Sequence, residues 1–224
     1  MASILPAAVR NAAFASLRSG VPSRLVLRVT ILLIIGCLVL PVGMVALGSG
    51  TGLIALPYEM FELAGRAPIL FPAHMLSSGL ALLFAPLVIA VRHRPDIHRA
   101  LGRLLGAFVV IGGLTSLPVA IMSHSPVLAR AGFVVQGLVW LFLFGGALIA
   151  IRQRNVLRHA HLMMAMAAVT TGAVWFRVIT GTAIALGLPF EPVYSLAAWA
   201  GWIIPLSLVL SSPRLVSAIL RRAT

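Results

Sequence analysis

The sequence predicts an all-α polytopic membrane protein, a bundle of six transmembrane helices with both termini in the cytoplasm. Three observations lead to this prediction. First, 61% of the 224 residues are hydrophobic and only 9% are charged, whereas about a quarter of the residues of a soluble domain are charged. Second, the apolar runs are about twenty residues long, which is the length of a helix that crosses a ~30 Å hydrocarbon core. Third, the basic residues are concentrated between alternate runs, as the positive-inside rule describes.

The first 28 residues form a basic segment ahead of the first apolar run. This segment contains four arginines and no acidic residue. Its pattern AAVRNAAFASLR is typical of a short amphipathic helix on a membrane surface. A mitochondrial presequence has a similar composition, so a targeting role stays open. The apolar run over residues 29–47 is too long for a signal peptide and is predicted to be the first span.

The other five spans are the apolar runs between basic or turn-like segments. The segment YEMFELAG, which precedes the second span, has the composition of an interfacial helix. All six spans belong to one domain over residues 29–212, followed by a basic cytoplasmic tail over residues 213–224. The remaining spans are predicted at residues 69–91, 104–122, 131–151, 161–187 and 193–211.

The distribution of charge predicts the orientation. All 17 basic residues of the Lys/Arg class are arginines, and fourteen of them fall on the side of the two termini. Only Arg66 and Arg130 fall on the opposite side. This asymmetry predicts a multi-pass protein of the cytoplasmic (inner) membrane with both termini inside. It also explains the net charge of +13 without nucleic acid, for which the sequence offers no soluble domain.

Single polar residues in the spans are the candidate functional residues. Arg177 lies within the fifth apolar run, where an ionisable group is costly and needs a partner, a cavity or a ligand. It follows His159 by eighteen residues, or five turns of a straight helix, so the two are expected on one face. His98 begins the third span on the same cytoplasmic side. Two imidazoles at matching depth on facing helices could ligate a haem iron.

A second polar layer is expected in the outer half of the membrane. His74 on the second span and Arg177 on the fifth lie at similar depth, and Ser78 and Gln136 could join them. The alternatives are structural: Arg177 could extend to lipid phosphates, and His74 could bond Ser78 or a backbone carbonyl. A Cu(I) site in the string HAHLMMAM is a further alternative, since thioethers and imidazoles suit that ion.

The order of these features resembles a family of bacterial membrane proteins known only as domain of unknown function 2306. The motifs that carry the resemblance are HMLSSGLAL, HRALGR before a glycine-rich span, and a histidine followed by an arginine eighteen residues later. The similarity covers about residues 70 to 212. It implies recurrent polar positions at His74, His98, Arg99, Gly102, Arg103, His159 and Arg177, and it implies no activity.

Three classes of function remain open at the level of sequence. The leading interpretation is a non-redox accessory or structural subunit, which is not an enzyme and has the lipid bilayer and subunits of a membrane complex as partners. The alternative is an electron-transfer module similar in logic to cytochrome b561, with haem b ligated by His98 and His159, and with His74 and Arg177 as further haem or quinone contacts. A small-molecule transporter or membrane enzyme is third, because all four acidic residues fall in loops and no inverted repeat is visible. Arg99, Arg103, Gln136 and Ser78 complete the candidate polar residues.

Overall fold

The computed structural model describes residues 33–212, and each element in this range is a helix. The chain divides into two compact units, residues 1–38 and 39–224, and the helices from α3 onward belong to the second unit. The expectations for the N-terminal segment and the basic tail fall on residues outside the described range, as does the start of the first predicted span.

Within the described residues, a π-helical turn and two short α-helices precede the long helices. A π-helical turn, Ile35–Val39, leads into α3, Leu40–Thr51, which ends at Gly52 with a left-handed φ of 74°, a helix ending that favours glycine. Helix α4, Tyr58–Arg66, lies in the segment predicted as an interfacial helix. Within the described residues, the apolar helix Gly36–Thr51 is shorter than a typical membrane span.

Five helical segments of the described chain are long and apolar enough to cross a membrane. The fold is therefore an all-α polytopic membrane bundle, as predicted, with five candidate spans and one shorter apolar helix. The bounds are α5, Leu70–Ala90; α6, Pro95–Met122; α7, Val127–Arg152; α8 and α9 of the fifth segment, Val156–Thr170 and Gly172–Ala185; and α10, Phe190–Ser211.

Several helices begin earlier than the apolar runs predict. Helix α6 starts at Pro95 instead of residue 104, so most of the predicted loop HRPDIHRALGR is helical. Proline at the first helical position has its φ already set for the helix, and the carboxylate of Asp96 in the first turn complements the helix dipole. Helix α8 begins at Val156, where the side chain of Asn155 accepts a hydrogen bond from the backbone N–H of Arg158. Both starts place polar residues on helices and not in loops.

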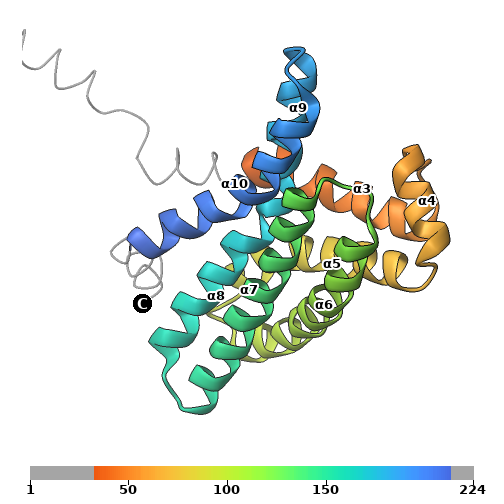
Figure 1. Ribbon diagram of the computed structural model, residues 1–224. Helices are drawn as coiled ribbons and strands as arrows, with labels where there is room; N and C mark the ends of the chain where they lie inside the picture. Colours follow the sequence, from red (N-terminus) through yellow and green to blue (C-terminus); the bar gives the residue numbers. More distant parts are fainter. Residues whose placement is uncertain (1–32, 213–224) are drawn as a thin grey trace, which may run out of the picture. The chain divides into compact units, whose positions relative to one another are not determined.

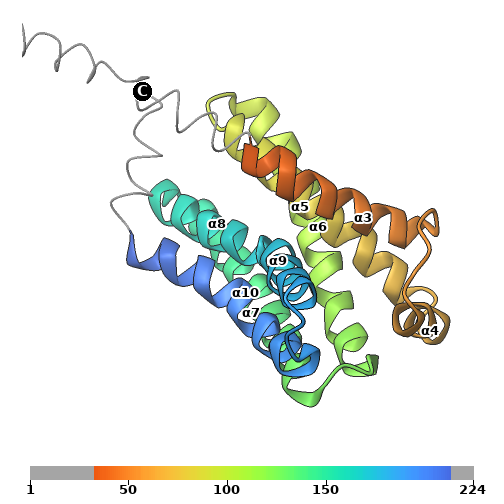
Figure 2. The same cartoon turned by 90° about the horizontal axis from the view of Figure 1, so that it is seen from above.

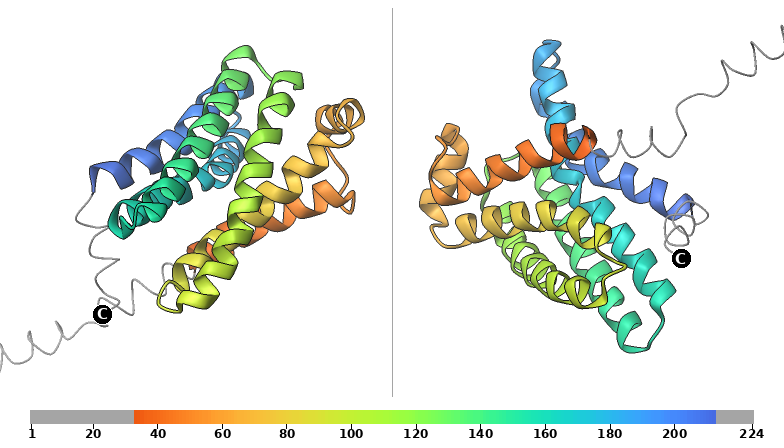
Figure 3. Two further views of the ribbon diagram at one scale, coloured as in Figure 1. Left: turned by 90° about the horizontal axis from the view of Figure 1, so that it is seen from below. Right: turned by 180° about the vertical axis from the view of Figure 1, so that it is seen from behind.

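The helices pack in chain order. Helix α5 lies between α3 and α6, and α7 lies between α6 and α8 (Figures 1 and 2). Helix α10 returns against α7, α8 and α9. The helix-to-helix connections can be followed from two further sides in Figure 3. This order brings α5, α6, α7 and α8 around a common interior.

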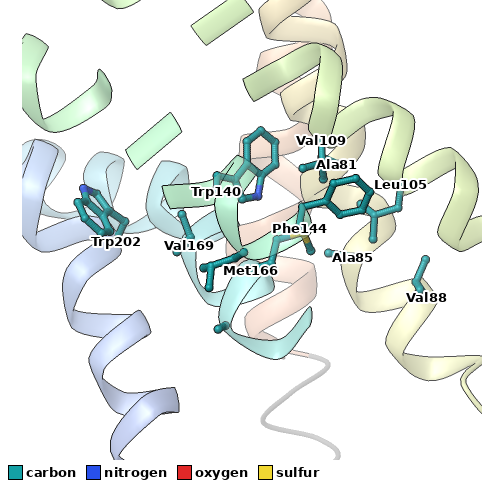
Figure 4. Close-up of a cluster of buried hydrophobic side chains, with 12 residues drawn as sticks. Ala81, Ala85, Val88, Leu105, Val109, Trp140, Phe144, Met166, Val169 and Trp202 are labelled. Atoms are coloured by element: carbon teal, nitrogen blue, oxygen red, sulfur yellow. The ribbon is translucent and has the colours of Figure 1, made fainter. Parts of the chain in front are cut away.

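The main hydrophobic core lies between these four helices and α10. Figure 4 shows its side chains, among them Val109 of α6, Trp140 of α7, Val169 of α8 and Trp202 of α10. Burial of such apolar side chains stabilises a bundle through close packing. A second cluster joins α3, α4 and α5 through residues such as Leu63 and Phe71.

The fifth candidate span is interrupted, which corrects the expectation of one straight helix. Helix α8 ends at Thr170 and α9 begins at Gly172, and the chain changes direction there (Figures 1 and 2). The Thr171 hydroxyl donates to the carbonyl of Ala168 at 2.7 Å, and such bonds back to the helix backbone bend helices. The argument that His159 and Arg177 share a face across five regular turns is therefore wrong.

Candidate functional site

A large cavity lies between α5, α6, α7 and α8. Its volume is about 1310 Å³, above the ~300–1,000 Å³ of most small-molecule sites. One wall is formed by core side chains that Figure 4 labels, including Val88, Leu105, Phe144 and Met166. The polar residues that line it are Arg92, His93, His98, Arg99, Arg103 and His159.

The cavity also shows which connections lie at the same end of the bundle. Arg92 and His93 come from the α5–α6 connection, and Val156 and Leu157 begin α8 just after the α7–α8 connection. All four residues line the cavity, so the two arginine-rich connections lie together. The distribution of arginines in the sequence predicted that these two connections lie on the same side. His93, an exposed residue of the α5–α6 connection, belongs to the lining as well.

His98 is fixed by the end of the preceding helix. Its Nδ1 lies 3.1 Å from the carbonyl oxygen of Val88, in the last turn of α5, where carbonyls have no partner within the helix. Arg92 caps the same end, with Nη1 donating to the carbonyl of Ile89 at 3.0 Å. The imidazole is half-buried and lines the cavity. The early start of α6 places this ring beside α5.

His159 is held in the same manner by α7. Its Nδ1 lies 2.9 Å from the carbonyl oxygen of Ala147. Ala147 is fully buried, and its small side chain allows α8 to approach the α7 backbone closely. His159 is half-buried and lines the cavity together with Met163, one turn further along α8.

These two hydrogen bonds determine which ring nitrogen remains available. A backbone carbonyl only accepts, so Nδ1 of each ring must carry the proton, and the neutral ring then keeps a lone pair on Nε2. Metal-bound histidines in proteins are oriented in this way, with the second ring nitrogen donating to a carbonyl, carboxylate or water. His98 and His159 are thus both prepared to offer Nε2 as a ligand to a molecule in the cavity.

His74 shows the same bond at a different place. Its Nδ1 lies 3.0 Å from the carbonyl oxygen of Gly112 on α6 and 3.3 Å from Oγ of Ser78. A side chain at position 112 would approach Ser78, since an added Cβ would lie 2.8 Å from Oγ. His74 and Ser78 are absent from the lining of the large cavity, so this histidine forms a separate contact between α5 and α6.

Arg177 lies beyond the helix break and is also absent from the lining of the large cavity. Its Nη1 donates to the carbonyl of Ala173, one turn earlier on α9, at 2.9 Å. Arg177 and His74 are thus both outside the cavity that His98 and His159 line.

Gln136 joins neither group, because it stabilises the break in the fifth span. Its Nε2 donates to the carbonyl of Val169 at 3.2 Å. One turn along α7, Nε1 of Trp140 donates to Oγ1 of Thr170 at 2.8 Å. The sequence identified Gln136 as polar and intramembrane, but the break that it caps was not predicted.

A smaller pocket of about 340 Å³ lies near the α6–α7 turn and the start of α10. It is lined by Glu59, His124, Ser125 and Glu191, among others, and a contact of 3.4 Å joins Nδ1 of His124 to a carboxylate oxygen of Glu62. Sequence analysis did not identify this cluster, because His124 is 62 residues from Glu62 along the chain and only the tertiary fold brings them together. Among the described residues, no group of three or more His, Cys, Asp or Glu side chains could hold a metal ion.

Comparison with known proteins gives one match. The family model described as "Predicted membrane protein (DUF2306)" matches residues 71–210, which confirms the resemblance found in the sequence. Comparisons with curated proteins and with solved structures give no match. The matched range contains the four helices around the large cavity.

Proposed function

Because the chain belongs to the DUF2306 family of predicted membrane proteins, a title that names no activity, we propose a function from the geometry of the large cavity. The protein binds haem b between α6 and α8, and His98 and His159 ligate the iron through Nε2. It serves as an electron carrier of the cytoplasmic membrane. The haem electron-transfer module, the alternative drawn from the sequence, thus replaces the non-redox accessory subunit as the leading interpretation.

The observation that carries the proposal is the pair of oriented imidazoles in one cavity. Two histidines on different helices line the same space of about 1310 Å³, and each has Nδ1 on a backbone carbonyl. The walls between them are mainly apolar, with aromatic and thioether side chains such as Phe144 and Met163. Apolar walls exclude water from a bound macrocycle and help to set its potential.

The chain contributes binding and orientation, and the haem contributes one-electron chemistry. Carbonyls of α5 and α7 hold the two imidazoles in place, so few degrees of freedom are lost when the ligand binds. His98 and His159 would hold the haem, and a haem iron held by two protein ligands would supply electron transfer and not the binding of a small substrate. A quinone in the bilayer or a subunit of a membrane complex would be the redox partner.

A second candidate function has support from the same bonds. His74, His98 and His159 each contact a backbone carbonyl of a neighbouring helix, and such bonds also serve helix packing alone. The protein would then be a non-redox accessory subunit. In that case, loss of His98 or His159 would alter expression or complex assembly and no spectrum would change.

The orientation belongs to the same proposal. The cavity opens near the two arginine-rich connections, which the positive-inside rule assigns to the cytoplasm. The haem would then lie in the cytoplasmic half of the membrane, with both termini on that side and six crossings in total. The apolar helix Gly36–Thr51 would form part of the first crossing.

Variants of the two ligands test the proposal. Full-length His98→Ala and His159→Ala proteins, purified in detergent and titrated with haem b, should lose the bis-histidine spectrum that the wild type develops. His161→Ala is the matched control, because Nδ1 of His161 bonds the carbonyl of Leu157 in its own helix and the residue does not line the cavity. Wild-type spectra from both ligand variants would contradict the assignment of the iron ligands.

A further inference from the structure

Two arginines of the cavity have no role in the ligation of the iron. Arg99 and Arg103 are one turn apart on α6 and both line the cavity. Like charges at this spacing repel each other. Within residues 33–212, no carboxylate lies within ion-pair distance of either guanidinium. The two charges therefore lack an anionic partner in the described part of the protein.

The space beside these arginines is open. Gly102 lies between them in sequence and lines the cavity, and an added Cβ at this position would meet no atom within 4 Å. Further along α6 the lining becomes apolar at Leu105 and Gly106. The cavity therefore has one basic end and one apolar end. A ligand that matches both is an amphiphile with a large apolar body and an anionic group.

We propose that Arg99 and Arg103 bind the propionate carboxylates of the haem and so fix which edge of the macrocycle points towards the basic end. This inference rests on the proposed function. Arginine suits the role because its planar guanidinium donates two parallel hydrogen bonds to one carboxylate. The phosphate of an anionic lipid has similar chemistry, so the experiment must distinguish the two sources of negative charge.

Esterified haem separates the carboxylates from the rest of the ligand. Wild-type protein and the double variant Arg99→Gln/Arg103→Gln, in discs of neutral phosphatidylcholine, are titrated with haem b and with its dimethyl ester. The double variant should bind haem b at least about tenfold more weakly than the wild type, since a charge-assisted hydrogen bond is worth that factor or more. Both proteins should bind the ester equally. Arg94→Gln is the control, because Arg94 is exposed as Arg99 and Arg103 are but does not line the cavity, and it should change neither affinity.

The midpoint potential gives a second readout. Positive charge near the iron favours the reduced state, so the double variant should have a lower potential than the wild type, while Arg94→Gln should differ much less. A structural role in folding alone would leave the potential of the bound haem unchanged.

Three results would overturn the inference, and they are distinct. If the double variant matches the wild type in affinity for haem b, the arginines do not bind the propionates. If the wild type binds haem b and its dimethyl ester equally in neutral discs, yet binds phosphatidylglycerol more tightly than the double variant does, the arginines bind lipid phosphate. If the wild type binds neither haem b nor its ester, the proposed function fails and this inference fails with it.

Discussion

At the scale of single residues, the same hydrogen bond recurs at three histidines. His74, His98 and His159 each direct Nδ1 to a carbonyl of the adjacent helix. Only His98 and His159 share a cavity. The surroundings of the imidazoles therefore differ, although the hydrogen bond of each ring is alike.

A buried bond between α7 and α8 gives a prediction at this scale. Replacement of Trp140 by phenylalanine removes the bond from Nε1 to Oγ1 of Thr170, where both residues are buried. The expected cost in unfolding free energy is about 1 kcal/mol, together with the packing lost around the smaller ring. Thermal unfolding in one detergent measures it.

The matched change is Trp175→Phe, because Trp175 is 39% exposed and its indole makes no hydrogen bond within residues 33–212. An unfolding midpoint that falls equally in the two variants would contradict a specific role for the Trp140–Thr170 bond.

At the scale of helices, the break at Thr171 depends on close packing from α7 and α10. A Cβ added at Gly172 would lie 2.5 Å from Nε2 of Gln136 and 2.9 Å from Cβ of Trp202. Position 172 thus has space only for glycine. The break separates a half-helix that contributes to the cavity, α8, from one that carries Arg177, α9.

Two alanine variants test this packing. Gly172→Ala should destabilise the protein by about 1–3 kcal/mol, the usual cost of forcing an extra group into a packed core. Gly181→Ala should be neutral or stabilising, since a Cβ there meets no atom within 4 Å and alanine favours helix over glycine. The unfolding midpoints of the two proteins report the difference. Equal midpoints would show that α7 and α10 do not confine the break.

The open face of α6 gives a further test of the cavity. Gly102→Leu fills space where an added Cβ meets nothing, so the protein should fold normally and bind haem b at least about tenfold more weakly than the wild type. Gly145→Leu is the matched control on α7. It also meets no atom within 4 Å and does not line the cavity. Haem titration of both variants gives the comparison, and unchanged binding to Gly102→Leu would place the haem elsewhere.

At the scale of the whole molecule, the arginine distribution and the fold agree about the two ends of the bundle. The α5–α6 and α7–α8 connections meet at the large cavity, whereas the α6–α7 turn and the start of α10 meet at the smaller pocket. If the end of the bundle at the large cavity is cytoplasmic, Asn155 faces the cytoplasm and Ser125 faces the outside.

Single cysteines test this orientation. In a Cys37→Ala background, which removes the one cysteine of the sequence, Ser125→Cys should react in intact cells with a maleimide that does not cross membranes. Asn155→Cys should react only after lysis. The reverse pattern would invert the proposed topology and place the cavity in the outer half of the membrane.

Much of the fold could be predicted from the sequence because hydropathy determines which segments can lie in lipid. The predicted second span differs from α5 by one residue at each end. The starts of the helices were predicted less accurately. Pro95 and Asp96 begin helix α6 within a charged segment that hydropathy alone excludes from a span. The break at Thr171 could not be predicted, because its stabilising partner, Gln136, is 35 residues earlier in the chain and only the fold brings the two together.

The candidate site was predicted only in part. His98 and His159 were paired by their depth in the membrane, and the structure gives them a common cavity. The expectation that Arg177 and His159 share one face assumed a straight helix, and the helix is interrupted at Thr171. Arg92 was missed as a residue of the cavity lining, because residues of a connection carry no periodic signal that shows which way they face.

An absorption spectrum of the full-length protein, purified from cells supplied with haem precursors, tests the central claim most directly. Recorded before and after reduction with dithionite, it should show a Soret band and a reducible α band. The haem content should approach one per chain, as expected for two histidine ligands in one cavity. Protein that is folded and monodisperse yet shows no Soret band, even after incubation with haem b, would contradict the account.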